Sequence, residues 1–266
     1  MSEEQNKPAY GIGSFMWHEC WTRDLPKAKD FWAKVAGWKF EEMDMGPAGK
    51  YNIIKVGDKT VGGMAAMAGP EWGEMPSHWG YYLDVEDVDA ALARAKELGG
   101  EPKHDPIEVP DVGRFCPVGA PDGSHVYLMT PAHRATEAPC PDPGHFLWVE
   151  LMSKDFAKAK DFYSKLMGWD VMEVPMPDGI VYNLFNTGNG SAGGGMQMPA
   201  EVPAEAPSAW IGYIHVADID KAVETVTAEG GQVIMPCMDI PNVGRMAHIV
   251  DPTGAFVALM TPAQMG

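Results

Sequence analysis

The sequence predicts an α+β protein made of four βαβββ units, arranged as two tandem domains over residues 10–131 and 142–262 with a linker at 132–141. Three observations lead to this prediction: an internal repeat, a restart of the same element order within each copy, and one helix for every four strands. The length of 266 residues also fits two domains, at roughly 100 to 200 residues each.

The repeat appears when the chain is compared with itself at an offset of 148 − 17 = 131 residues. Twelve of the 24 residues in 15–38 are identical to their counterparts in 146–169. A second block, 109–132, matches 240–263, and both end in Leu-Met-Thr-Pro-Ala. The chain is therefore a tandem duplication.

Each element has its own local pattern in the first copy. Residues 15–22 predict a strand, and residues 26–36 predict a helix that Gly37 ends, because apolar residues recur there at helical spacing. Further strands are predicted at 38–43, 51–56 and 60–66, before a connector rich in Pro and Gly at 68–77. The order then restarts with a strand at 79–85, a helix at 88–98, and strands near 101–109, 114–118 and 125–129.

Composition restricts the expected partners and compartment. The net charge of 20 − 37 = −17, without a cluster of Lys and Arg, argues against nucleic acid as a partner. No apolar run reaches the ~18 residues that a membrane helix needs, and residues 1–8 lack the apolar core of a secretory signal. The four cysteines are far apart, so we expect free thiols in a cytoplasmic protein.

A fixed order of motifs carries a resemblance to a known family. In each copy a strand is followed by Thr/Ser-x-Asp-x-x-x-Ala-x-x-Phe-Trp/Tyr and Gly-Trp, then by Asp-Val/Ile-Asp-x-Ala, Gly-Gly, and Pro-x-Gly before an apolar strand. This order resembles the vicinal oxygen chelate superfamily, which includes glyoxalase I, bleomycin-resistance proteins, fosfomycin-resistance enzymes and extradiol dioxygenases. The likeness covers 15–131 and 146–262.

The most specific stretch, 238–255, keeps Asp251-Pro-Thr-Gly254 intact, whereas the first copy has Ala120 in place of Asp251. It is similar to the two-domain glyoxalase-like branch that is often labelled as hydroxylases. The resemblance implies that each pair of βαβββ units forms a curved mixed sheet, and that this sheet makes a cup for a divalent metal and a small substrate.

The resemblance also implies where metal ligands would stand: seven residues before the Asp that opens each helix, and four residues after the Gly of Asp-Pro-x-Gly. These positions hold Trp17, Gly80 and Tyr127 in the first copy, and Trp148, Ile211 and Ala258 in the second. Tyrosine is an uncommon ligand, and the other five do not bind metals through their side chains. We therefore expect no metal at the usual centre and neither standard glyoxalase I nor extradiol dioxygenase activity.

Two carboxylates recur on the inward face of the first strands. Glu19 shares that face with Trp17, and its counterpart Glu150 shares it with Trp148, because alternate residues of a strand point the same way. A carboxylate among aromatic rings is expected to have a raised pKa and to act as a general acid or base. Glu19, Glu150 and Tyr127 are therefore the candidate catalytic residues.

The alternative role for both glutamates is a structural ion pair. Arg114 and Arg245 recur at equivalent positions and would supply the partners. Two histidines also fall on the predicted inward faces, so Glu19, His78 and His125 form a candidate metal set of the His₂-carboxylate kind, which suits non-haem iron or another divalent metal. The second copy lacks both histidines, and its weaker candidate set is Glu150, His215 and His248.

The remaining candidates are expected to bind a ligand. Tryptophans and tyrosines recur near the strand openings of both copies and suggest an aromatic cavity of ligand size, with a packed core and cross-strand pairing as the alternatives. The candidate ligand-binding residues are Trp17, Trp79, Trp148, Trp210, Tyr51, Tyr182, Arg114 and Arg245.

Two functions remain open at this point. The leading prediction is a small-molecule-binding protein with lyase, isomerase or hydroxylase chemistry that uses Glu19 or Glu150. The alternative is a non-catalytic binding or sequestering protein of the drug-resistance kind, because aromatic walls suffice for binding and an acidic surface attracts a cationic drug. The polar residues around Glu19 predict that the first cup is the more reactive one. The second cup could then serve packing or dimerisation, so both a monomer and a homodimer stay open.

Overall fold

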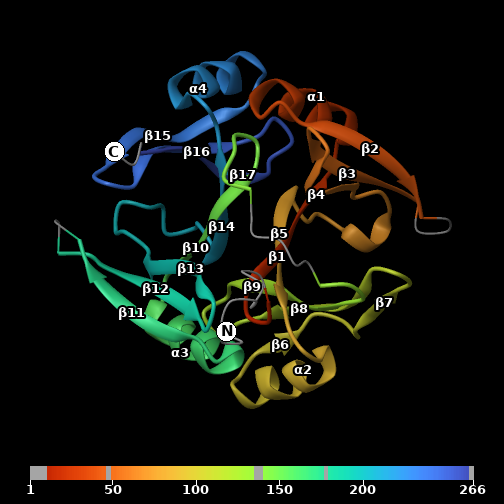
Figure 1. The fold of residues 1–266 in the computed structure, drawn as a ribbon, viewed down its shortest axis with the longest axis vertical. Helices are drawn as coiled ribbons and strands as arrows, with labels where there is room; N and C mark the ends of the chain where they lie inside the picture. The colour runs from red at the N-terminus through yellow and green to blue at the C-terminus, as the bar shows by residue number, and fades with distance from the viewer. Residues whose placement is uncertain (1–10, 46–48, 135–139, 177–178, 264–266) are drawn as a thin grey trace, which may run out of the picture. The chain divides into compact units, whose positions relative to one another are not determined.

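The computed structural model describes residues 11–45, 49–134, 140–176 and 179–263. Figure 1 shows the strands and helices that these residues form. The first copy contains β1 (Phe15–Thr22), α1 (Leu25–Val35), β2 (Lys39–Asp44), β3 (Lys50–Val56), β4 (Lys59–Ala66), η3 (Pro70–Trp72), β5 (His78–Asp84), α2 (Val88–Glu97), β6 (Glu101–Pro102), β7 (Ile107–Val109), β8 (Gly113–Gly119) and β9 (His125–Pro131). The second contains β10 (Phe146–Ser153), α3 (Phe156–Met167), β11 (Asp170–Pro175), β12 (Val181–Thr187), β13 (Gly190–Gln197), β14 (Ala209–His215), α4 (Ile219–Ala228), β15 (Gln232–Ile240), β16 (Gly244–Val250) and β17 (Phe256–Pro262).

Each copy forms one mixed sheet, which confirms the predicted α+β fold of four βαβββ units. The strand orders are β2-β3-β4-β1-β5-β9-β8-β6, with β7 on β8, and β11-β12-β13-β10-β14-β17-β16-β15. The first strand of each βαβββ unit pairs in parallel with the last strand of the same βαβββ unit, as β1 does with β4. The other strand pairs within a βαβββ unit are antiparallel.

One predicted strand differs between sequence and structure. Residues 101–109 were expected to form a single strand, but β6 and β7 are separated by residues 103–106. Pro106 has no N–H for the ladder, which favours the break. The counterpart β15 is continuous, and its register shifts between Met235 and Met238 accommodate Pro236.

The aspartates of the recurring motifs begin the helices. Asp24, Asp87, Asp155 and Asp218 are the N-caps of α1, α2, α3 and α4, and each side chain accepts a hydrogen bond from the backbone N–H three residues later. Such caps stabilise a helix by about 1 kcal/mol. This structural role explains why these residues recur in both copies.

The described residues divide into two compact units that each combine parts of both copies. The α1/α4 unit comprises the described residues of Trp17–Gly80, Pro139–Trp148 and Ile211–Gly266, and the α2/α3 unit comprises those of Met1–Met16, Tyr81–Ala138 and Val149–Trp210. Residues 135–139 of the expected linker lie outside the described residues. Among the helices described, none is long and apolar enough to cross a membrane.

The α1/α4 unit is held together by a buried polar contact. Helix α1 packs against α4, as Figure 1 shows, and Trp32 of α1 donates its indole N–H to the Asp251 carboxylate at 3.2 Å. Asp251 also accepts hydrogen bonds from the Thr253 and Ala255 backbone N–H groups and from the Thr253 hydroxyl. The intact Asp-Pro-Thr-Gly motif is therefore a turn that also receives α1.

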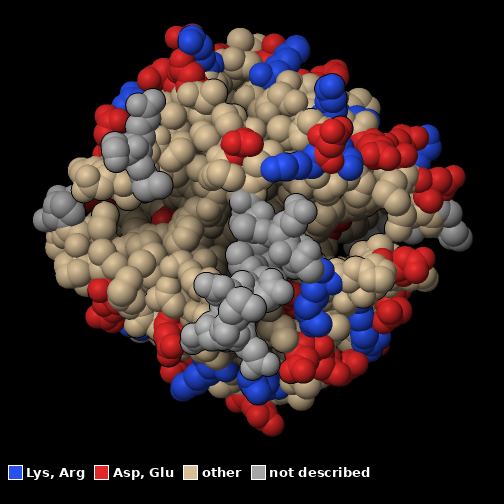
Figure 2. All heavy atoms as spheres, in the orientation of Figure 1, with Lys and Arg blue, Asp and Glu red and all other residues tan. Residues whose placement is uncertain are grey.

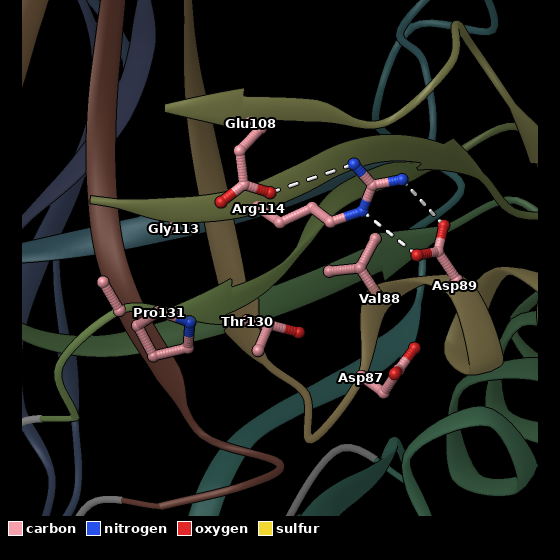
Figure 3. Close-up of a pocket in the computed structure, with 9 residues that line it drawn as sticks. Asp87, Val88, Asp89, Glu108, Gly113, Arg114, Thr130 and Pro131 are labelled. Atoms are coloured by element: carbon pink, nitrogen blue, oxygen red, sulfur yellow. Dashed lines mark hydrogen bonds and ion pairs between the residues drawn. The ribbon is translucent and has the colours of Figure 1, made fainter. Parts of the chain in front are cut away.

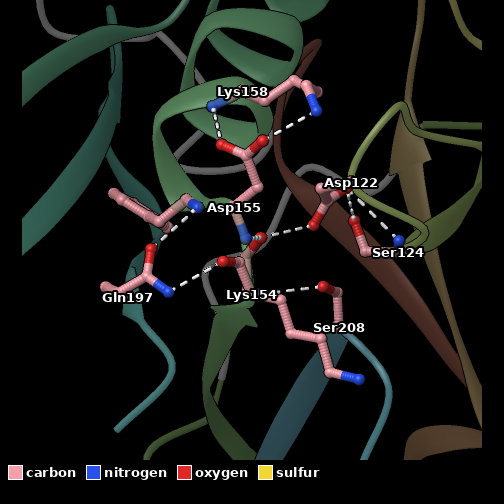
Figure 4. A network of polar contacts seen from close by, with 9 residues as sticks. Asp122, Ser124, Lys154, Asp155, Lys158, Gln197 and Ser208 are labelled. Carbon is pink, nitrogen blue, oxygen red and sulfur yellow. Dashed lines mark hydrogen bonds and ion pairs between the residues drawn. The ribbon is translucent and has the colours of Figure 1, made fainter. Parts of the chain in front are cut away.

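The α2/α3 unit has an equivalent buried polar contact between a helix and a turn, made by different residues. Tyr163 of α3 stands where Trp32 stands in the first copy, and its hydroxyl lies 2.9 Å from the Ser124 hydroxyl. Asp122 replaces the missing acid of Ala120, because it accepts hydrogen bonds from the Ser124 and Ser153 hydroxyls at 2.7 and 2.6 Å. Figure 4 shows this network around Asp122.

Several charged side chains at the surface form pairs of opposite sign. Lys34 pairs with Glu229 within the α1/α4 unit, and Lys165 pairs with Asp161 within the α2/α3 unit. On the face drawn in Figure 2, Lys and Arg side chains stand next to Asp and Glu. Exposed pairs of this kind contribute about 0–1 kcal/mol each.

Candidate functional site

The inner face of β1 carries an alternating row of Trp17, Glu19 and Trp21. Glu19 is buried, with 5% of its surface exposed, while both tryptophans are partly buried. Cys20 is completely buried on the opposite face. The alternation predicted from the sequence is thus present in the structure, and it places a carboxylate between two indole rings.

Tyr51 of β3 joins this row. The Trp17 indole N–H donates to the Tyr51 hydroxyl at 3.0 Å, and the Tyr51 hydroxyl in turn hydrogen-bonds to Glu19. Burial, the charge of Glu19 and this hydrogen bond raise the pKa of Tyr51 well above its ordinary value, and the Trp17 N–H opposes them. The phenol therefore stays protonated at neutral pH and acts as a donor to the carboxylate.

A glycine makes this contact sterically feasible. Gly63 of β4 lies opposite Glu19 in the parallel ladder, and a Cβ atom on it would stand 1.7 Å from the Tyr51 hydroxyl. The ladder between β3 and β4 also shifts register between Ile54 and Lys55. Gly63 lets the tyrosine ring lie across β4 and reach β1, which is a role that the sequence did not reveal.

The α2/α3 unit repeats this arrangement with its own residues. Glu150, 7% exposed, lies opposite Gly194, and a Cβ atom on Gly194 would stand 2.3 Å from the Tyr182 hydroxyl. Glutamate, tyrosine and glycine thus recur at an offset of 131 residues. Trp148, the counterpart of Trp17, is partly buried and belongs to the α1/α4 unit.

The last strands of the two copies differ at the position of the usual metal ligand. In the first copy Tyr127 is buried and its ring stacks on Tyr82, with centroids 4.3 Å apart. In the second copy the equivalent residue is Ala258, which faces Tyr213 on one side and His248 on the other. The Tyr213 hydroxyl lies 3.3 Å from His248 Nε2. Burial lowers the pKa of His248 to about 4, so its imidazole is neutral at pH 7.

Sequence reasoning missed Tyr82 and Tyr213. Both lie on the inner face two residues after Gly80 and Ile211, the positions already identified. The period of two along a strand could therefore have found them. Tyr82 stacks on Tyr127 and Tyr213 pairs with Ala258, so both lie beside positions at which the resemblance implies a metal ligand.

The candidate metal residues are not gathered into a metal site. Within the described part of the chain, no group of three or more His, Cys, Asp or Glu side chains is placed to hold a metal ion. His78 Nδ1 lies 2.9 Å from the Pro76 carbonyl oxygen, and His125 is exposed at the start of β9. His215 Nδ1 lies 2.6 Å from the Pro141 carbonyl oxygen.

Trp79 and Trp210 pack in the aromatic cores of their units. Trp79 is 6% exposed, and its ring lies 5.3 to 5.9 Å from those of Phe146, Trp38 and Trp32. Trp210 is 5% exposed and lies 4.9 Å from Phe15 and 5.1 Å from Tyr163. These contacts favour the packed core over a cavity wall for both residues.

The two arginines line equivalent surface pockets. Arg114 pairs with Asp89 at 3.0 Å and with Glu108 at 3.9 Å, beside a pocket of about 300 Å³ that Figure 3 shows. Arg245 pairs with Asp220 at 3.0 Å and with Asp239 at 2.9 Å, beside a pocket of about 350 Å³. Their charges are thus matched by these exposed aspartates and Glu108, which are not the inner glutamates.

The fold and this pattern of residues match one family model twice. Residues 12–127 and 145–259 each match the Glyoxalase/Bleomycin resistance protein/Dioxygenase superfamily. The chain belongs to this superfamily, and it consists of two tandem glyoxalase domains, each a curved mixed sheet.

Individual relatives agree with this assignment. The candidate glyoxylase CFP32 of Mycobacterium tuberculosis is 29% identical over 96% of this chain and 97% of its own length. The anthracycline biosynthesis protein DnrV of Streptomyces peucetius is 31% identical over 44% of this chain and 46% of its own. Among solved structures, the Mn(II)-bound glyoxalase from Novosphingobium aromaticivorans has a TM-score of 0.62 at 13% identity, over 94% of this chain and 82% of that one. The 2,3-dioxygenase LapB from Pseudomonas sp. KL28 has a TM-score of 0.61 at 12% identity, over 95% and 94%. At such identities the structural likeness concerns the fold alone.

Proposed function

We propose that the protein binds a small, apolar or aromatic compound at the inner face of β1, and that Glu19 transfers a proton to or from it. The observation that carries this proposal is the contact chain from the Trp17 indole through the Tyr51 hydroxyl to the buried Glu19. A carboxylate held by a protonated tyrosine is positioned rather than free to rotate, which favours directed proton transfer.

The chemistry follows from the groups present. A carboxylate can remove a proton from the carbon next to a carbonyl group, and the electron pair then moves onto the carbonyl oxygen. Returning a proton to the opposite face of the same carbon completes an isomerisation, and expelling a leaving group from the adjacent carbon, with its bonding electron pair, completes a lyase reaction. Neither outcome needs an oxidant, so proton transfer is the reaction class that Glu19 and Tyr51 support best.

The proposal is tested by hydrogen exchange into a simple aromatic ketone. The full chain is incubated in D₂O with 1-indanone, and loss of the protons next to the carbonyl is followed by ¹H NMR. General acid–base catalysis typically contributes about 10²- to 10⁴-fold, so Glu19→Gln should slow the protein-catalysed exchange at least about 100-fold. Exchange by the wild type no faster than by Glu19→Gln would overturn the proposal.

A second function is favoured by different observations. DnrV, a relative over about half of this chain, is named as an anthracycline biosynthesis protein. The charge of −17 attracts cations, and aromatic residues line the face of β1. If 1-indanone binds with a stoichiometry of one and no exchange occurs, the protein sequesters its ligand rather than transforming it.

A further inference from the structure

An aromatic pair at the end of the inner face of β1 distinguishes the first copy from the second. Trp21 follows Glu19 on this face, and its ring lies 4.8 Å from that of Trp72 at an angle of 39°. Trp72 ends η3, in the connector between β4 and β5. The second copy has Met152 in place of Trp21, and its connector, residues 198–208, contains no aromatic residue.

The Trp21 indole nitrogen is buried and has no hydrogen-bond partner within the described residues. Trp79 shares this property, but its ring lies in an aromatic core. Trp21 is only partly buried, and its ring contact is with the connector. Because a buried donor without an acceptor destabilises a protein, each such donor needs an explanation. An acceptor atom on a ligand would provide one.

Arg23 fixes the connector that carries Trp72. Its side chain donates to the carbonyl oxygens of Met75 at 2.7 Å, Gly73 at 2.6 Å and Trp72 at 3.2 Å, and its backbone N–H donates to the Ser77 hydroxyl at 3.0 Å. In the second copy the Lys154 side chain makes one such bond, to the Ala204 carbonyl oxygen at 2.5 Å. The first connector is therefore held in place over Trp21.

We propose that the Trp21 and Trp72 rings, which contact each other, form one continuous aromatic surface on which a neutral, planar aromatic ketone lies, and that its carbonyl oxygen accepts the Trp21 N–H. A neutral acceptor is favoured because Glu19 lies two residues away on the same face and disfavours an anion. The proposal rests on the proposed function, since it assumes that the ligand lies at this face, and it names the ligand class. A donor at the carbonyl oxygen also stabilises the negative charge that develops there when Glu19 removes a proton.

Two probes of matched shape separate the ring contact from the hydrogen bond. 1-Indanone carries a carbonyl group, and indane is the same bicyclic molecule without it. Affinities for the wild-type full chain are measured by equilibrium dialysis. We expect 1-indanone to bind about fivefold more tightly than indane, because one neutral hydrogen bond contributes roughly 1 kcal/mol.

The variants assign this preference to a residue. Trp21→Phe keeps a ring but removes the N–H, so it should abolish the preference for 1-indanone over indane. Trp72→Ala should weaken both probes alike, by about five- to tenfold, because it removes one aromatic face. Met152→Leu, at the equivalent position of the second copy, should change neither affinity.

An NMR signal gives a second and direct readout. The Trp21 indole N–H resonance, assigned by its absence in Trp21→Phe, should move downfield with 1-indanone and stay in place with indane. An unchanged preference in Trp21→Phe, no downfield shift, or no saturable binding of either probe would each contradict the proposal that Trp21 and Trp72 bind the ketone.

The outcomes for Glu19 and Trp21 are distinguishable. If Glu19→Gln stops exchange while Trp21→Phe keeps the preference for the ketone, the proposed function stands and the proposal for Trp21 and Trp72 is wrong. If Trp21→Phe loses the preference while Glu19→Gln still exchanges protons, the proposal for Trp21 and Trp72 stands and the proposed function is wrong.

Discussion

Tyr51 reaches Glu19 only because residue 63 is a glycine. A Cβ atom there would stand 1.7 Å from the Tyr51 hydroxyl. We expect Gly63→Ala to displace the tyrosine and to lower the free energy of unfolding by about 1–3 kcal/mol, as overpacking does. Urea unfolding measures this change. Gly188→Ala is the control, since nothing lies within 4 Å of its Cβ position; equal effects of the two substitutions would contradict the account.

Two buried histidines predict an acid-sensitive stability. Burial lowers the pKa of His18 to about 3 and that of His248 to about 4, from 6.5 in the unfolded chain. The unfolded chain therefore binds more protons below pH 6.5, so folding loses stability as pH falls from 6.5 through the folded pKa values. At pH 5 each histidine should cost about 2 kcal/mol relative to pH 7.

His18→Phe tests this expectation without removing the ring, which stacks on Phe146 at 4.0 Å. Urea unfolding of the wild type and the variant at pH 7 and pH 5 isolates the histidine from the carboxylates that titrate in the same range. The variant should lose less stability between the two values of pH. Equal losses of the free energy of unfolding in both proteins would contradict the lowered pKa of His18 in the folded protein.

The turn that begins at Asp251 connects β16, β17 and helix α1. Asp251→Ala would leave the Trp32 indole N–H and two backbone N–H groups without their acceptor. We expect a loss of about 2–4 kcal/mol in the free energy of unfolding. The control is Asp220→Ala, an exposed partner of Arg245, whose loss should cost at most about 1 kcal/mol. A loss of under 1 kcal/mol for Asp251→Ala would refute this role.

Local patterns predicted the elements well and the contacts between them poorly. The strand at 15–22 was predicted with the bounds of β1, because alternation and helical spacing are properties of neighbouring residues. The contact of Trp32 with Asp251 joins residues 219 positions apart, and no local pattern contains it. The aspartates of the shared motifs were placed at the helix starts from the sequence, and the structure shows that their side chains cap the helices.

The candidate site was predicted in part for the same reason. Glu19 and Trp17 follow from the period of two along β1. Their link to Tyr51 depends on the tyrosine ring lying across β4 at Gly63, and the Trp72 contact depends on the path of a connector rich in Pro and Gly. These features depend on tertiary packing rather than on local sequence.

Each compact unit combines halves of both sequence copies, which has consequences for the whole chain. Phe31 and Trp32 of the first copy are buried, and Trp32 contacts Asp251 of the second. We expect residues 10–131 and 142–262, expressed separately, to be unfolded or to associate, because each would expose such apolar side chains. Circular dichroism and light scattering measure both outcomes. Two stable monomeric fragments would contradict the role given to these contacts.

The claim that the inner face of β1 in the first copy is the functional site is tested most directly by a crystal structure of the full chain with 1-indanone. The account predicts one ligand whose ring lies against Trp21, with its reactive carbon within reach of the Glu19 carboxylate. Density for the ligand beside Glu150 alone, or in the surface pocket lined by Arg114, would contradict it.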